Sequence, residues 1–317
     1  MARRGGGFVS HLIFGPREKR GLTVRYRCYG LTIDSSMDVP GGVSIRDDAP
    51  LGNTIAADAE ICFENTELDD PERVKVPYQQ RADQILFDAP NVGRYLAIAG
   101  RRLHVSPHPQ SHSDDVGALL VATALPMLMW MRGGLVLHSG AVIMAGNTSA
   151  VAIAGASGSG KSSLIDALMN RGARLVGDDT LSVTREANML TIAGLAGGYF
   201  RREPGSETRH FVAVGAEHSA DAAKLAALVV FDQNASADAP PLRRLAGVEA
   251  VEWVLRNRHR PKIPSLLRRD IDVFDLCRLL SQCCPIYALG RESRSVEELA
   301  DVVASLDAHI QKGDRCV

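Results

Sequence analysis

Short β-type runs dominate the first third of the chain. Between Arg25 and Ser106 such runs recur at 26–33, 60–63, 84–87, 95–98 and 103–105, with turn signals at Pro40-Gly41-Gly42 and near Gly100. The pattern predicts a β-rich N-terminal domain over residues 21–115. A loosely ordered arm rich in glycine and arginine is expected before it, at residues 1–20. This part of the sequence contains no catalytic motif, so it gives no indication of function.

The longest apolar run covers residues 116–131. Ser113, Asp114 and Asp115 precede it as helix-start residues, and Gly133-Gly134 follows as a stop, which predicts a helix. A membrane span is the alternative, but the run is short for a hydrocarbon core and Pro126 interrupts it. We therefore expect a buried helix that joins two domains, and no membrane partner.

Alternating strand and helix patterns then predict an α/β domain over residues 116–312. Residues 135–145 and 149–154 flank Gly146-Asn147, a hairpin signal, and are expected to pair. A helical pattern follows at 164–169 and ends near Gly172, and buried strands are expected at 174–177, 225–231 and 285–289. Ser295 and Glu298 have the spacing of a capping box that opens a final helix.

Composition excludes several classes of protein. The chain has 317 residues, 45% hydrophobic and 23% charged, with a formal net charge of −1, so no overall charge attracts nucleic acid or a membrane. Its six cysteines lack metal-ligand spacing and no secretory signal is evident, which favours reduced thiols in the cytoplasm. The sequence leaves the oligomeric state open, a homo-oligomer included.

Residues 151–163, VAIAGASGSGKSS, contain the pattern G-x-x-x-x-G-K-[ST] between a predicted strand and a predicted helix. In such a loop, backbone N–H groups surround phosphate oxygens, so the sequence predicts ATP binding. Lys161 is expected to reach the β- and γ-phosphates, and Ser162 to hold Mg²⁺. The full set of expected nucleotide-binding residues is Gly155, Ala156, Ser157, Gly158, Ser159, Gly160, Lys161, Ser162 and Ser163.

Asp178 and Asp179 end the strand that follows the helix of the loop. A short strand–helix–strand unit usually places its strands side by side, which would bring both carboxylates to the edge of the sheet where the loop lies. One carboxylate could then hold Mg²⁺ and the other accept a proton from an attacking hydroxyl. Asp178 as a plain turn residue, and His138 as a buried core residue, are the structural alternatives.

Three blocks together resemble a known family: LHSGAV at 137–142, GASGSGKSS at 155–163 and RGARLVGDDTLSV at 171–183. They resemble the kinase domain of the HPr kinase/phosphorylase family, which shares its core with ATP-dependent phosphoenolpyruvate carboxykinases. The resemblance covers roughly residues 118–310. It implies an α/β fold in which a P-loop kinase domain follows the β-rich N-terminal domain, and transfer of the γ-phosphoryl group of ATP to a serine of a peptide or small protein.

Carried over residue by residue, the resemblance implies Asp178 as the general base, with His138 and Lys161 as further catalytic residues. It implies Ser162 and Asp179 as Mg²⁺ ligands. The later signature of bifunctional members has only a loose counterpart here, Glu203 in GLAGGYFRREPGSE, a third metal-ligand candidate. Residues 26–33, YRCYGLTI, also resemble the start of kinases that phosphorylate the C-terminal serine of lasso-peptide precursors.

Three other functions remain open at this point. The first is a kinase/phosphorylase that acts on a sugar-transport phosphocarrier protein, and the second is a non-catalytic regulator whose ATP state controls a partner. The third is a small-molecule kinase or a relative of the carboxykinases. A basic segment, Arg256 to Arg269, contributes either a solvated face or a landing site for an acidic substrate segment. It lacks interleaved aromatic residues, which argues against a nucleic-acid partner.

Overall fold

The computed structural model describes residues 23–45, 56–186, 189–202, 209–236, 240–290 and 294–311. The expected arm at 1–20, Glu203 and the last residue of the predicted second domain lie outside these ranges. Within them the chain is a mixed α/β structure with two nine-stranded sheets and one separate hairpin.

The first sheet, here the N-terminal sheet, has the strand order β3-β1-β2-β4-β9-β8-β7-β6-β5. Most neighbours are antiparallel, but β2–β4 and β4–β9 are parallel. Its strands are β1 (Val24–Cys28), β2 (Leu31–Ser35), β3 (Val43–Ile45), β4 (Ala59–Phe63), β5 (Arg73–Lys75), β6 (Tyr78–Arg81), β7 (Gln84–Ala89), β8 (Gly93–Ile98) and β9 (Arg102–Pro107).

Most of the strands expected in this region are present, with one correction. Residues 95–98 and 103–105 pair around Gly100 as predicted, within the β8–β9 hairpin. The single run predicted at 26–33 is instead two strands, because Tyr29 and Gly30 both have positive φ (54° and 77°) and form the turn of the β1–β2 hairpin.

The second sheet, here the central sheet, contains the glycine-rich loop. Its main path is β10-β14-β15-β18-β12-β11-β13, and β20 extends it from β18 with β19 beyond. Its strands are β10 (Leu135–Leu137), β11 (Ser139–Ile143), β12 (Ser149–Ala154), β13 (Arg174–Gly177), β14 (Leu181–Glu186), β15 (Met189–Ala193), β18 (Ala222–Asp232), β19 (Leu242–Leu245) and β20 (Ile286–Gly290); the separate hairpin is β16 (Gly198–Arg202) with β17 (Arg209–Ala213).

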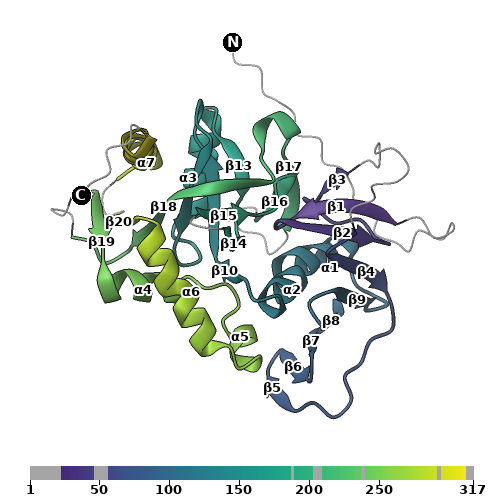
Figure 1. Ribbon diagram of the computed structural model, residues 1–317. Helices are drawn as coiled ribbons and strands as arrows, with labels where there is room; N and C mark the ends of the chain where they lie inside the picture. The colour runs from purple at the N-terminus through teal and green to yellow at the C-terminus, as the bar shows by residue number, and fades with distance from the viewer. Residues whose placement is uncertain are drawn as a thin grey trace.

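Helices cover both faces of the central sheet. On one face, α3 and α7 pack together with β11, β13 and β18 in one apolar cluster, and α2, α4 and α6 lie on the other face (Figure 1). The helical elements are α1 (Ser113–Leu119), the π-helical turn η1 (Leu120–Ala124), α2 (Leu125–Met131), α3 (Lys161–Asn170), the 3₁₀ turn η2 (Ala216–His218), α4 (Gly247–Arg256), α5 (Lys262–Leu266), α6 (Asp270–Cys283) and α7 (Val296–Gln311).

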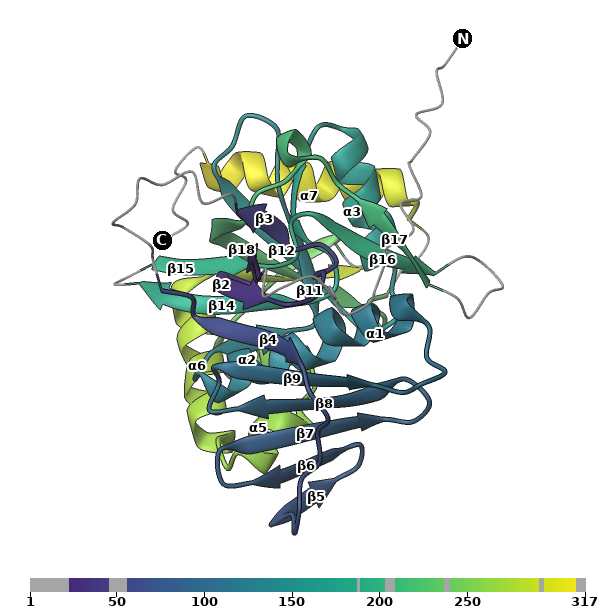
Figure 2. The same cartoon turned by 90° about the vertical axis from the view of Figure 1, so that its right-hand side faces the viewer.

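The predicted buried helix is the continuous segment α1–η1–α2, which lies between the two sheets (Figure 2). By length and composition Ser113–Met131 would suit a membrane span, but 72% of its apolar window is buried inside the fold. Trp130 and Leu128 are completely buried in a core cluster that also contains Ile33 of the N-terminal sheet and Ile192 of the central sheet. One hydrophobic core therefore connects the two sheets through this helix.

The strand order of the central sheet differs from the expectation that the strands before and after the loop helix lie side by side. The hairpin predicted from 135–145 and 149–154 is realised by β11 and β12, while β10 separates at His138 and pairs with β14. β13 does not lie beside β12, because β11 is between them and is antiparallel to both. β12 and β13 therefore run in the same direction, and their carboxyl ends still meet at one edge of the sheet.

Candidate functional site: the glycine-rich loop and its two cavities

The segment from Gly155 to Gly160 connects β12 to α3 in a tight curve. Gly158 and Gly160 have φ of 78° and 100°, a backbone conformation that glycine adopts without steric cost. A Cβ on Gly155 would lie 2.8 Å from Ser159 Oγ and 2.9 Å from Phe231 Cβ, so the loop also needs glycine for close approach. The first N–H groups of α3 have no partner within the helix, which makes this turn suitable for an anion.

Lys161 is buried and folds back over the loop. Its Nζ donates hydrogen bonds to the carbonyl oxygens of Gly155 (2.8 Å) and Ala156 (3.2 Å) and lies 3.2 Å from His138 Nε2. Burial lowers the pKa of Lys161, and the nearby carboxylates of Asp179 and Asp178 oppose this effect. The ammonium group is therefore held at the centre of the loop.

His138 occupies the break between β10 and β11. Its backbone N–H donates to the carbonyl of Asn257 at 2.7 Å, which fixes the break, and its Nδ1 lies 3.4 Å from Asp179 Oδ1. Burial lowers the pKa of His138, although Asp179 acts in the opposite direction. With Lys161 donating to Nε2, the ring carries its proton on Nδ1 and directs it to Asp179.

Asp178 lies directly beside the start of α3. Ser162 Oγ donates to Asp178 Oδ2 at 3.1 Å, and Asp178 Oδ1 is buried without a hydrogen-bond partner. Burial, followed by the adjacent Asp179, raises the pKa of Asp178 to about 7. A buried carboxylate oxygen without a partner beside a serine hydroxyl matches the oxygen donors that Mg²⁺ requires.

Gly140 allows this close packing. A Cβ there would lie 2.2 Å from Ile165 Cδ1 and 2.5 Å from the carbonyl oxygen of Asp178. Any larger residue would push β11 away from α3 or displace Asp178. The glycine in the His-Ser-Gly segment is thus explained by sterics.

Asp179 differs from its neighbour in exposure. Its side chain is 56% exposed, whereas Asp178 as a residue is 6% exposed. One ligand atom each from His138, Asp179 and His259 lie within 4.8 Å of one another, a second arrangement that could hold a metal ion. The two adjacent aspartates therefore have different surroundings and can have different roles.

His259 is a site residue that the sequence analysis did not single out. It is buried, its Nε2 lies 2.7 Å from the carbonyl oxygen of Ala122, and its Nδ1 lies 3.4 Å from Thr180 Oγ1. A carbonyl can only accept, so Nε2 carries the proton. Burial is the main cause that lowers the pKa of His259, to about 4, so the ring is neutral. In the sequence, the position of His259 inside the basic segment was the signal that could have identified it.

Two cavities meet at the loop. The first, of about 400 Å³, lies between the loop and the N-terminal sheet, and the second, of about 580 Å³, lies toward α4. Both are lined by Ala122, Ser157 and Asp179. The first also contains Tyr29, Ser162, Asp178, Thr180, Tyr199 and Phe200; the second also contains His138, Asn234, Trp253, Arg256, Arg258, His259 and Arg260.

The residues of the basic segment have two kinds of surroundings, and neither is a plain solvated face. Arg256, Arg258 and Arg260 line the second cavity. Lys262 instead donates to the carbonyl of Val76 at 2.8 Å, and Arg269 donates to the carbonyl of Trp130 at 2.5 Å, so these two join parts of the fold.

The remaining predicted residues also lie at the loop. Ala156, Ser157, Ser162 and Ser163 are exposed along the loop and the first turn of α3, while Ser159 is buried.

No known protein family matches this chain, and no curated protein matches it. Among solved structures, the chain is similar to the HPr(Ser) kinase/phosphatase from Coxiella burnetii, with 16% sequence identity and a TM-score of 0.36. The match covers 56% of this chain and 98% of that chain.

Proposed function

We propose that this protein is an ATP- and Mg²⁺-dependent kinase that transfers the γ-phosphoryl group to a serine hydroxyl. The observation that carries the proposal is the meeting of two cavities at Ser157 and Asp179, beside the loop that ends in Lys161. A phosphotransferase must hold donor and acceptor in line on opposite sides of one phosphorus atom. A regulator that only binds ATP needs a single cavity.

The second cavity is assigned to ATP. Its cationic side chains, Arg256, Arg258 and Arg260, match a polyphosphate, and Trp253 and Asn234 offer an aromatic face and an amide to a base. Lys161 would exchange its loop carbonyls for the β- and γ-phosphate oxygens. The unpaired N–H groups at the start of α3 would receive the same phosphates.

Ser162 and Asp178 would hold Mg²⁺, because their oxygens already face each other and Asp178 Oδ1 lacks a protein partner. Bound there, the ion would neutralise charge that develops on the transferred group. This assignment exchanges the roles that the family resemblance gives to the two aspartates.

Asp179 would then be the general base. It borders both cavities, and the Nδ1–H of His138 points to it, so its carboxylate is held beside the acceptor cavity. The serine hydroxyl would enter from the first cavity, next to Tyr199 and Phe200, and give its proton to Asp179 as the oxygen attacks phosphorus.

The identity of the phosphoryl acceptor is inferred from the sequence resemblance alone. This resemblance favours the C-terminal serine of a lasso-peptide precursor, with a sugar-transport phosphocarrier protein as the other candidate. The first cavity is lined in part by Tyr29, which belongs to the segment that carries the lasso-related resemblance.

Mass spectrometry after incubation with Mg²⁺-ATP tests the proposal. Peptides that end in serine and the phosphocarrier protein would be offered in parallel, and one added phosphate on either acceptor is expected. ATP that binds tightly without any transfer would favour the regulator.

The variants Asp178→Asn and Asp179→Asn distinguish the metal ligand from the general base. We expect Asp179→Asn to lose transfer by at least about a hundredfold while it still binds Mg²⁺-ATP. Asp178→Asn should lose the Mg²⁺ dependence of ATP binding. The reverse outcome would restore the roles that the family resemblance implies.

A further inference from the structure

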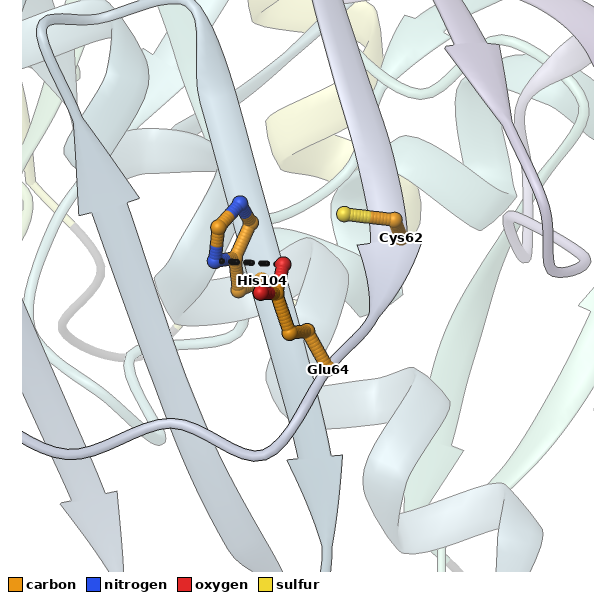
Figure 3. A group of neighbouring side chains, drawn as sticks. All are labelled: Cys62, Glu64 and His104. Atoms are coloured by element: carbon orange, nitrogen blue, oxygen red, sulfur yellow. Dashed lines mark ion pairs between the residues drawn. The ribbon is translucent and has the colours of Figure 1, made fainter.

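The outer face of the N-terminal sheet carries a group of three side chains, Cys62, Glu64 and His104 (Figure 3). β4 and β9 run parallel, and Cys62 and His104 are register partners on them. Glu64 follows β4 directly, and its N–H donates to the carbonyl of Val105 at 3.1 Å, which extends the pairing. Backbone hydrogen bonds therefore fix all three positions.

The side chains converge in a way that suits a metal ion. His104 Nδ1 lies 3.1 Å from Glu64 Oε2, and one ligand atom from each of the three residues lies within 4.8 Å of the others. Two ligands of a tetrahedral zinc ion lie about 3.3 Å apart, given bonds of 2.0–2.1 Å. The imidazole and carboxylate are already near this spacing, and the thiol points toward the imidazole (Figure 3).

We propose that Cys62, His104 and Glu64 bind a zinc ion, with the fourth position left to solvent. A thiolate and an imidazole select zinc over Mg²⁺, which prefers oxygen ligands, so this site is chemically distinct from the loop. As the sulfur–zinc bond forms, the Cys62 thiol releases its proton to water. The side chain of Glu64 is 57% exposed, which leaves a path for the ion to enter.

A nucleophilic cysteine is the competing use of the same residues. Such a thiol needs positive charge beside it, which lowers its pKa. Here burial, followed by the carboxylates of Glu64 and Glu60, raises the pKa of Cys62, with Arg102 as the opposing charge. The acidic neighbours instead favour a cation. A bound ion would link the end of β4 to the middle of β9 and stabilise this parallel ladder.

Titration of the metal-free, full-length protein with Co²⁺ tests the site. Cobalt bound to a thiolate gives a charge-transfer absorption band in the near ultraviolet. We expect one equivalent of Co²⁺ to produce this band and Zn²⁺ to displace it. The group His138–Asp179–His259 contains no thiol and gives no such band.

Variants assign the ligands. Cys62→Ser and His104→Gln should abolish the band, and Glu64→Gln should weaken Co²⁺ binding at least about tenfold. Cys283→Ser, which changes an exposed cysteine on α6, is the matched control and should keep the band. No band in the wild-type protein, a band that survives Cys62→Ser, or unchanged affinity in Glu64→Gln would overturn the three-ligand site.

Thermal unfolding gives a second readout that is independent of cobalt spectroscopy. Zn²⁺ should raise the midpoint of wild type and Cys283→Ser, because it binds the folded state, and should raise that of Cys62→Ser by less, since only the group His138–Asp179–His259 remains intact there. An equal shift in Cys62→Ser would show that zinc binds elsewhere and would overturn the proposal. Kinase activity does not enter this experiment, so its result is separate from that of the phosphotransfer assay.

Discussion

Lys161 shows how single side chains prepare the loop. Its ammonium group is satisfied by the carbonyls of Gly155 and Ala156 and sits 3.2 Å from His138 Nε2. Phosphate oxygens that displace these carbonyls would gain charge-assisted hydrogen bonds without moving the backbone. The sequence motif could place this residue at the loop because its spacing is local to one strand, turn and helix.

Replacement of Lys161 by alanine should weaken Mg²⁺-ATP binding about tenfold to a hundredfold, the value of a charge-assisted hydrogen bond of 1.5–3 kcal/mol. Titration calorimetry would measure the change. Lys262→Ala is the matched control, since it removes the same charge from a lysine that bonds the carbonyl of Val76. Equal losses in both variants would show a general charge effect and contradict the role of Lys161 in the loop.

Within the helix α1–η1–α2, Pro126 leaves two backbone carbonyls without their usual helical N–H partner. Pro126 has no N–H, so it cannot bond the carbonyl of Val121 in the π-helical register or that of Ala122 in the α-helical register. Side chains from distant elements bond both carbonyls: Tyr29 Oη donates to Val121 at 2.9 Å, and His259 Nε2 to Ala122 at 2.7 Å. The π-helical turn therefore forms part of the walls of both cavities, through Val121 in the first and Ala122 in both.

Tyr29→Phe should lower the free energy of unfolding by about 1–3 kcal/mol, because Val121 keeps a buried carbonyl without its partner. Pro126→Ala supplies a new N–H in reach of that carbonyl. A double-mutant cycle in urea should therefore show a smaller cost for Tyr29→Phe in the Pro126→Ala background. Strict additivity of the two changes would contradict this account.

Short sequence signals encode the caps of two helices. Ser295 and Glu298 form the expected capping box, with reciprocal bonds of 2.7 and 3.2 Å at the start of α7. Gly172 ends α3 with a φ of 89°, and the N–H groups of Gly172 and Ala173 bond the carbonyls of Met169 and Leu168. These could be predicted because each depends on residues within one turn.

At the scale of the whole molecule, the N-terminal sheet contacts the rest of the fold outside the common core as well. Arg73 of β5 donates to the carbonyl of Leu266 at 2.6 Å, and the N–H of Tyr29 donates to the carbonyl of Gly194 at 2.9 Å. Such contacts tie both ends of the N-terminal sheet to the remainder of the fold. The bond between Tyr29 and Gly194 also holds Tyr29 at the first cavity.

We expect the described sheets to unfold in one cooperative transition. Trp130 is completely buried in the helix between them, so in a Trp253→Phe background its fluorescence should report the loss of their shared core. Far-ultraviolet circular dichroism and fluorescence should give the same urea midpoint. Two separated midpoints would show that the N-terminal sheet is an independent folding unit.

Stability should also depend on pH through His259. The folded-state pKa is lowered to about 4 from an ordinary value of 6.5, so the unfolded chain binds the proton more readily. The contribution of His259 to the free energy of unfolding should therefore fall as pH decreases from about 6.5 toward 4. Asp178 acts in the opposite direction over this range, because its folded-state pKa is raised to about 7. In urea unfolding, the free energy of His259→Gln should therefore fall less, or rise more, on acidification than that of the wild type, and an unchanged slope would contradict the role of His259.

The sequence by itself determined the glycine-rich loop, the helix that follows it, the caps and most hairpins, because each depends on neighbours a few residues apart. It also placed Asp178 and His138 near the loop, through their order along the chain. Only the tertiary structure decided that β11 separates β12 from β13, that His259 completes the site, and that Cys62 meets His104. Sheet order sets these long-range neighbours, and local spacing does not encode it.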